Sequence, residues 1–144
     1  MLLQHGALAI DLPGNWLDHS TLLFLRPPDG IAAPTARIEQ VPEAISLSFM
    51  RGVTAEVALL RQAEQLRALD PTMVVLRETA FPCALGAARA YEQRVTLNGR
   101  AVQQLVVACV VGEVTVLISA AASVERFPRY ESELATIIKN IRPL

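Results

Sequence analysis

The dipeptide Asn98-Gly99, set between two β-prone runs, constrains the fold more than any other feature of this sequence. Both central residues of a two-residue type I′ turn need positive φ angles, which Asn and Gly adopt at the least cost. Such a turn also fixes the strand register, and the expected pairs are Leu97 with Arg100, Val95 with Val102, Gln93 with Gln104, and Tyr91 with Val106. Because side chains alternate across a strand, these residues are expected to share one face of an antiparallel sheet.

The expected hairpin joins strands at residues 87–97 and 100–111. An apolar run at residues 105–122 overlaps its second strand, and this run is long enough to resemble a membrane helix. Its middle is interrupted by Gly112 and Glu113, and the run is rich in valine. Two buried strands joined by a tight turn account for this pattern better than a helix does. We therefore expect a strand at residues 114–122 and no insertion into a membrane.

Other patterns place the remaining elements. Alternation predicts strands at residues 7–12, 21–26, 36–42 and 73–79, and helical spacing predicts a long helix at residues 49–69 that ends at Asp70-Pro71. A second helix is expected to follow Ser123 as its N-cap, with Pro128 in its first turn, and to run to about Asn140. The result is an α+β fold, a twisted and mainly antiparallel sheet of about six or seven strands with two helices. A chain of 144 residues predicts a single domain, residues 1–144.

The long helix has a broad apolar side, formed by Val53, Leu59, Leu60, Ala63 and Leu66. Its polar side is expected to carry Arg51, Arg61, Gln62 and Gln65. A helix that lies on one sheet needs only a stripe of apolar residues. Two readings stay open: the helix is simply well buried, or part of this side meets a partner.

Composition and motifs exclude several function classes. The net charge of −1 and the lack of a basic stripe argue against nucleic-acid binding. The sequence has no phosphate-binding glycine motif and no His or Cys cluster with metal-ligand spacing. His19 stands beside Asp18 and Ser20, but adjacent residues of one loop do not converge as a catalytic triad does. We therefore expect no enzyme, cofactor or metal, and we expect Cys83 and Cys109 to be free thiols.

Two glutamines are predicted to face each other on the mostly apolar face of the hairpin, Gln93 and Gln104. An amide buried without hydrogen-bond partners costs about 1–3 kcal/mol. The two amides either satisfy each other across the strands or line a groove and bond to a guest molecule. The residues alone favour mutual satisfaction.

The segment AIDLPGNWLDHSTLLFLRPPDG resembles the opening of the DcrB-like family, whose members are similar in fold to the PsbP and Mog proteins. The resemblance is carried by an ordered set of residues, Leu12, Pro13, Trp16, Asp18, Ser20, Phe24 and Pro27. Within that family the sequence is most similar to the cytoplasmic Eag-type chaperones of type VI secretion effectors. The start of the chain has no basic segment typical of an export signal, which agrees with an expected cytoplasmic location.

This resemblance implies a non-enzymatic, homodimeric chaperone or adaptor. It would bind and shield the apolar N-terminal transmembrane helices of an effector and aid loading of the effector on the secretion spike. By position, the resemblance implies a partner-binding groove formed by Leu23, Leu59, Ala63, Leu66, Val102, Gln104 and Val106. The hairpin register adds Gln93, and under the resemblance the glutamines are expected to bond to the guest.

Two alternatives remain. A PsbP-like or Mog-like interaction module would bind a folded protein through its outer surface and would have no chaperone role. A small-molecule binder or enzyme would need convergent polar groups with perturbed pKa values, which the sequence does not indicate.

Overall fold

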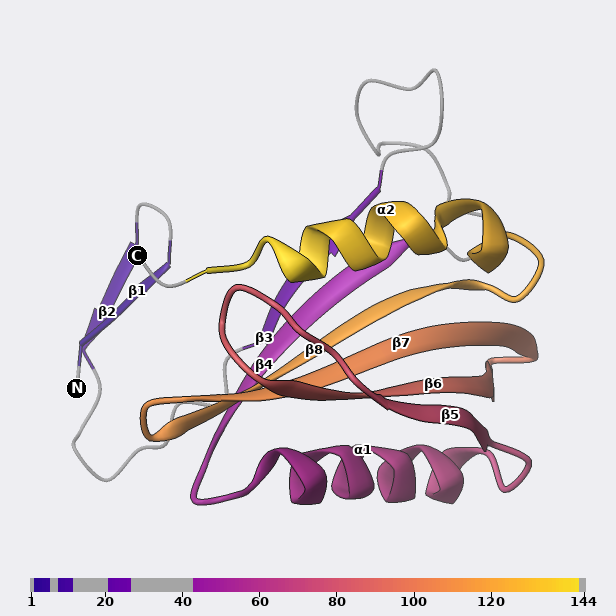
Figure 1. Ribbon diagram of the computed structural model, residues 1–144, viewed down its shortest axis with the longest axis horizontal. Helices are drawn as coiled ribbons and strands as arrows, with labels where there is room; N and C mark the ends of the chain where they lie inside the picture. The colour runs from indigo at the N-terminus through magenta and orange to yellow at the C-terminus, as the bar shows by residue number, and fades with distance from the viewer. Residues whose placement is uncertain (1, 6–7, 12–20, 27–42, 143–144) are drawn as a thin grey trace.

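The computed structural model describes residues 2–5, 8–11, 21–26 and 43–142. Its centre is a six-stranded sheet of order β3-β4-β8-β7-β6-β5, in which all neighbours are antiparallel. The strands are β3 (Thr21–Leu25), β4 (Ala44–Arg51), β5 (Val74–Ala80), β6 (Ala88–Leu97), β7 (Arg100–Val111) and β8 (Val114–Ser123). Helix α1 (Ala55–Leu69) lies on one face and α2 (Phe127–Lys139) on the other (Figure 1). The predicted α+β class is confirmed. A separate two-stranded sheet pairs β1 (Leu2–His5) with β2 (Leu8–Asp11).

The hairpin of β6 and β7 has the predicted register. Gln93 pairs with Gln104, and Leu97 pairs with Arg100 at the turn. Asn98 and Gly99 both have positive φ angles, 52° and 75°. The turn therefore decides which side chains of the central strands face each helix.

The alternation of side chains gives the sheet two separate cores. On the α1 side, the core is formed by Ala58, Leu59, Ala63, Met73, Tyr91, Val95, Val102, Val106 and Ala108. On the α2 side, residues of β4, β6, β7 and β8 pack with Phe127, Tyr130, Leu134 and Ile138 of α2. The strands are consequently buried from both faces along the middle of the sheet.

The apolar run at residues 105–122 forms the second half of β7 and most of β8, two strands as predicted. Val111 pairs with Val114 across a turn in which Gly112 has a φ of 62°. Neither described helix has the length and hydropathy needed to cross a bilayer.

The predicted start of the long helix at residue 49 is wrong. Residues 44–51 form β4, which pairs with both β3 and β8, and its Ile45 and Leu47 are buried. The helix begins after Thr54, whose hydroxyl accepts a hydrogen bond of 3.2 Å from the backbone N–H of Val57. Its predicted end at Asp70 is confirmed.

The predicted cap of the second helix is also wrong. Ser123 closes β8, where it pairs with Val102, and α2 starts at Phe127 without a side-chain cap. Pairing of β8 with β7 continues through Ser123, beyond the predicted end of this strand at residue 122. Pro128 does lie in the first turn of α2, as predicted. The predicted strand at residues 36–42, together with Trp16 and the Asp18-His19-Ser20 step, lies outside the described residues.

Candidate functional site

The residues of the predicted groove all lie on the α1 side of the sheet or on α1 itself, but α1 covers most of them. The buried ones are Leu59, Ala63, Gln93, Val102 and Val106. Leu66 and Gln104 are half-buried, and Leu23 on the edge strand β3 is 62% exposed. The structure therefore brings most of this set together as core, and it leaves Leu23, Leu66 and Gln104 with surface that a partner could reach. That these residues bind a partner stays a prediction.

Strand pairing extends the hairpin's α1-side face across β8 onto β4 and β3, the two strands on which α1 does not pack closely. The row that contains Gln93 and Gln104 continues through Ala121 of β8 and Ala44 of β4 to Leu25 of β3. The row that contains Val106 continues through Ser119 and Ser46 to Leu23. Helix α1 contacts chiefly β6, β7 and β8. The outer parts of both rows are half-buried or exposed among the described residues.

We call this area the β3–β4–β8 surface, and it consists of Leu23, Leu25, Ala44, Ser46, Gln104, Ser119 and Ala121. Its floor is made of small side chains, alanine and serine. Exposed leucines of β3 stand along one margin, and Gln104 stands at the other, beside α1. This floor was not predicted, because no strand was expected at residues 44–51. The alternation of Ile45 and Leu47 with Ala44, Ser46 and Ser48 was the available signal.

A chain of amides links the margin of this surface to the helix. Gln62 Nε2 donates to Gln93 Oε1 at 2.9 Å, and Gln93 Nε2 donates to Gln62 Oε1 at 3.0 Å and to Gln104 Oε1 at 2.7 Å. The expectation that Gln62 lies on the polar side of the helix is wrong, because this side chain is buried against the sheet. Gln62 lies one helical turn from Leu59 and thus shares its face, whereas Leu60 is exposed. Spacing, rather than polarity, was the correct signal.

The structure bears on both readings of the glutamine pair. Gln93 and Gln104 are hydrogen-bonded across the strands, which is the mutual satisfaction favoured by the residues alone. Gln104 nevertheless remains half-buried, and its Nε2 has no protein acceptor within the described parts of the chain. Gln104 therefore has hydrogen-bonding capacity left for another molecule.

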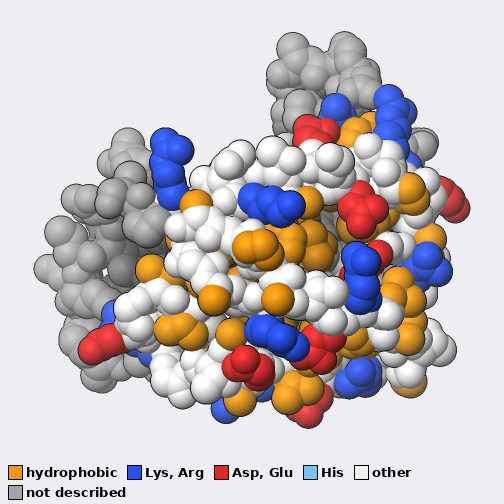
Figure 2. Space-filling view, viewed as in Figure 1, with side chains coloured by type: hydrophobic (Ala, Val, Ile, Leu, Met, Phe, Trp, Pro, Cys, Tyr) orange, Lys and Arg blue, Asp and Glu red, His pale blue; other side chains and the backbone are white. Residues whose placement is uncertain are grey.

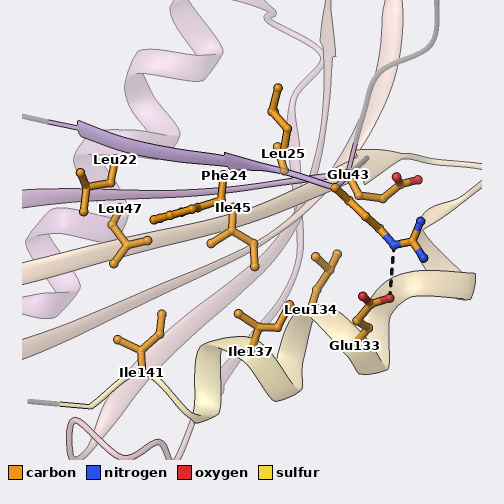
Figure 3. A pocket seen from close by; sticks show the side chains of 12 residues that line it. Leu22, Phe24, Leu25, Glu43, Ile45, Leu47, Glu133, Leu134, Ile137 and Ile141 are labelled. Atoms are coloured by element: carbon orange, nitrogen blue, oxygen red, sulfur yellow. Dashed lines mark ion pairs between the residues drawn. The ribbon is translucent and has the colours of Figure 1, made fainter. Parts of the chain in front are cut away.

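On the opposite face, a cavity of about 490 Å³ opens between the β3–β4 pair and α2 (Figure 3). Its walls are mainly apolar and include Leu22, Phe24, Ile45, Leu47, Leu134, Ile137 and Ile141. Charged groups gather at one end, where Arg26 pairs with Glu133 at 3.5 Å and the buried Glu43 pairs with Arg126 at 3.0 Å. Such a cavity can hold apolar groups. The cavity was not predicted, because β4 and the packing of α2 create it.

Ion pairs cover the far edge of the sheet, where β5 meets β6. Arg77 contacts Glu92 at 2.8 Å, and Arg89 contacts Glu78 at 2.9 Å. On the side of the molecule seen in Figure 2, positive and negative side chains alternate with apolar ones. This face therefore carries mixed charge rather than a stripe of one sign.

The perturbed titratable groups have structural explanations. The Thr72 hydroxyl, at 2.6 Å, and the Thr96 backbone N–H, at 2.8 Å, bond to the Asp70 carboxylate and lower its pKa. Burial raises the pKa of the Cys109 thiol, so this thiol is held in its protonated form. Both Cys83 and Cys109 are free, as expected. No group of His, Cys, Asp and Glu side chains within the described ranges could hold a metal ion.

Comparison with known proteins addresses the fold. No family model and no curated protein matches the sequence. The chain is similar in structure to PA94 from Pseudomonas aeruginosa, a protein of unknown function, with a TM-score of 0.74 and 14% identity over 100% of this chain and 96% of that one. It is also similar to the cyanobacterial PsbP protein CyanoP of Synechocystis sp. PCC 6803, with a TM-score of 0.52 and 11% identity over 89% of this chain and 95% of that one.

The chain has a PsbP-like fold. At these identities the likeness concerns the fold alone. The predicted PsbP-like architecture is thus confirmed.

Proposed function

We propose that this PsbP-like chain is an Eag-type chaperone of type VI secretion. In this proposal it is a cytoplasmic, non-enzymatic homodimer that needs no cofactor and binds neither nucleic acid nor membrane directly. It binds the apolar N-terminal helices of an effector, shields them from water and aids loading of the effector on the spike. The DcrB-like sequence pattern suggests this function, and the β3–β4–β8 surface is the observation that supports it best.

The shape of the β3–β4–β8 surface suits an apolar helix. Ala44, Ser46, Ser119 and Ala121 project little from the sheet, and small residues of this kind let a helix approach closely. Leu23 and Leu25, which are 62% and 43% exposed, then contact the side of the helix. Each Å² of apolar surface removed from water contributes about 25 cal/mol.

The same surface offers hydrogen bonds at its centre and margin. The hydroxyls of Ser46 and Ser119 and the amide of Gln104 lie among apolar neighbours. Serine and glutamine side chains can bond to polar groups of a guest helix that would otherwise be buried without a partner. In this proposal, the buried Leu59, Ala63, Val102, Val106 and Gln93 fix α1 in place beside the guest.

The alternative is a protein-interaction module without a chaperone role. The observation that favours it is the apolar cavity between the β3–β4 pair and α2, which could receive side chains of a folded partner. That partner would contact the α2 side of the sheet. The two functions therefore predict effects of mutation on opposite faces.

The test is co-expression with the N-terminal segment of a spike-associated effector encoded beside the chaperone gene. We expect a soluble complex that co-purifies, and we expect Leu23→Asp on the edge strand β3 to abolish it. Leu76→Asp is the matched control, because Leu76 is a 45% exposed leucine on the opposite edge strand β5. Loss of the complex in the control as well, or an intact complex with Leu23→Asp, would refute the assignment of the surface. Absence of any complex with the unmodified chain would refute the chaperone function.

A further inference from the structure

Gln93 occupies the middle of the amide chain and has no exposed surface. Both N–H groups of its amide are used, one toward Gln62 at 3.0 Å and one toward Gln104 at 2.7 Å. Its oxygen accepts from Gln62 at 2.9 Å. The orientation of the Gln93 amide thereby decides which atom of Gln104 faces inward.

The reverse orientation would present the oxygen of Gln104 outward. If all the linked amides turned over together, Gln62 and Gln93 would keep their reciprocal pair, and Gln104 would donate to Gln93. One N–H of Gln93 would then be buried without an acceptor, whereas the observed orientation leaves only a spare lone pair on its oxygen. Buried unpaired donors are much rarer than carbonyls with a spare lone pair, and the difference disfavours the reverse state by about tenfold or more.

We infer that Gln62 and Gln93 are positioning residues that hold Gln104 with its amide nitrogen toward the β3–β4–β8 surface, so that this surface selects guests that offer a free backbone carbonyl. The inference rests on the proposed function. Gln104 Oε1 is already occupied by Gln93, and Gln104 Nε2 has no acceptor within the described part of the protein. The side chain therefore meets the guest as a donor.

Because Gln104 meets the guest as a hydrogen-bond donor, only certain parts of an apolar helix can lie against it. In the interior of a helix, each carbonyl is bonded to the N–H four residues later. Carbonyls are free in the last turn or one turn before a proline, which lacks the N–H. The guest is thus expected to place a helix end or a proline kink over Ala121, the neighbour of Gln104 in the row.

The test uses two probes, a Leu–Ala helix with one central proline and its proline-free version, each fused to a soluble carrier protein. We expect the unmodified chain to bind the proline-containing helix about tenfold more tightly, as one hydrogen bond to a buried carbonyl implies. Gln104→Met and Gln104→Glu should remove this preference, because neither side chain donates from the amide position. Gln65→Glu, a change at an exposed position of α1, is the control and should keep it. A preference that survives in Gln104→Met would overturn the inference.

A second readout needs no guest. In the free protein, NMR should find the side-chain amide protons of Gln93 protected from exchange and those of Gln104 exchanging rapidly. Gln62→Leu should speed exchange at Gln93 and should weaken the preference for the proline-containing helix, while Leu23 and the rest of the surface stay unchanged. Protected Gln104 protons in the free protein would show that its nitrogen faces inward and would overturn the inference. If neither helix binds while the exchange pattern is as expected, the proposed function fails and the orientation of Gln104 stands.

Discussion

The amide chain beneath α1 supports a quantitative prediction about stability. Replacing Gln62 with leucine, a side chain of similar size, removes both of its hydrogen bonds with Gln93. Gln93 is fully buried, so one N–H and one carbonyl oxygen are then left without partners and without water. Each orphaned group costs about 1–3 kcal/mol, and Gln62→Leu should therefore lower the free energy of unfolding by about 2–6 kcal/mol.

That loss is a large fraction of the total stability expected for a domain of this size, about 5–15 kcal/mol. It corresponds to a decrease in Tm of about 10 °C. Urea denaturation is the better assay, because a shift of the midpoint with an unchanged slope isolates stability from a change in compactness.

The double variant Gln62→Leu/Gln93→Leu distinguishes the stability lost through orphaned polar groups from the stability lost through poorer packing. When both partners become apolar, no buried amide is left unpaired, and the cost can approach zero. Gln104 loses its donor in this variant, but it is half-buried and can bond to water instead. The double variant should thus be more stable than Gln62→Leu alone. A single variant as stable as the unmodified chain, or a double variant that shows the sum of two losses, would refute this reasoning.

Three further predictions follow from local geometry. Since hydrogen bonds, first among them that from the Thr72 hydroxyl, lower the pKa of Asp70 below its usual 3.8, its ionised form stabilises the fold above pH 3.8. Asp70→Asn should lower the Tm at pH 7, and its difference from the unmodified chain should vanish as the pH falls through the lowered pKa. Gly99→Ala meets no atoms but must keep a φ of 75°, so it should cost about 1 kcal/mol by backbone strain alone in urea denaturation. Ile138→Ala, at a fully buried position of α2, should cost about 2–5 kcal/mol, whereas Ile137→Ala at the 44% exposed cavity rim should cost clearly less; equal losses would contradict the described packing.

Local sequence signals were enough to predict the central part of the sheet. Asn98-Gly99 imposes a turn that only a narrow set of residues adopts, and a two-residue turn leaves one register, so the pairing of Gln93 with Gln104 could be read directly. Gly112-Glu113 and the valine-rich runs beside it similarly determined a second turn. These signals are local, because they act within a few residues of the chain.

Which side chains of each face become buried depends on long-range packing. Residues 44–51 alternate as a strand should, but they border directly on a helical pattern, and only pairing with both β3 and β8 separates β4 from α1. The position of Gln62 depends on how α1 is rotated about its axis against the sheet. The packing of Ala58, Leu59 and Ala63 sets this rotation, and the same rotation buries the polar side chain of Gln62. The residues of the predicted groove share the α1 side of the sheet or lie on α1, and how far α1 covers each of them depends on contacts between elements that are distant in the sequence. Burial is set by the sum of such contacts across the sheet, and no local pattern of the sequence encodes that sum.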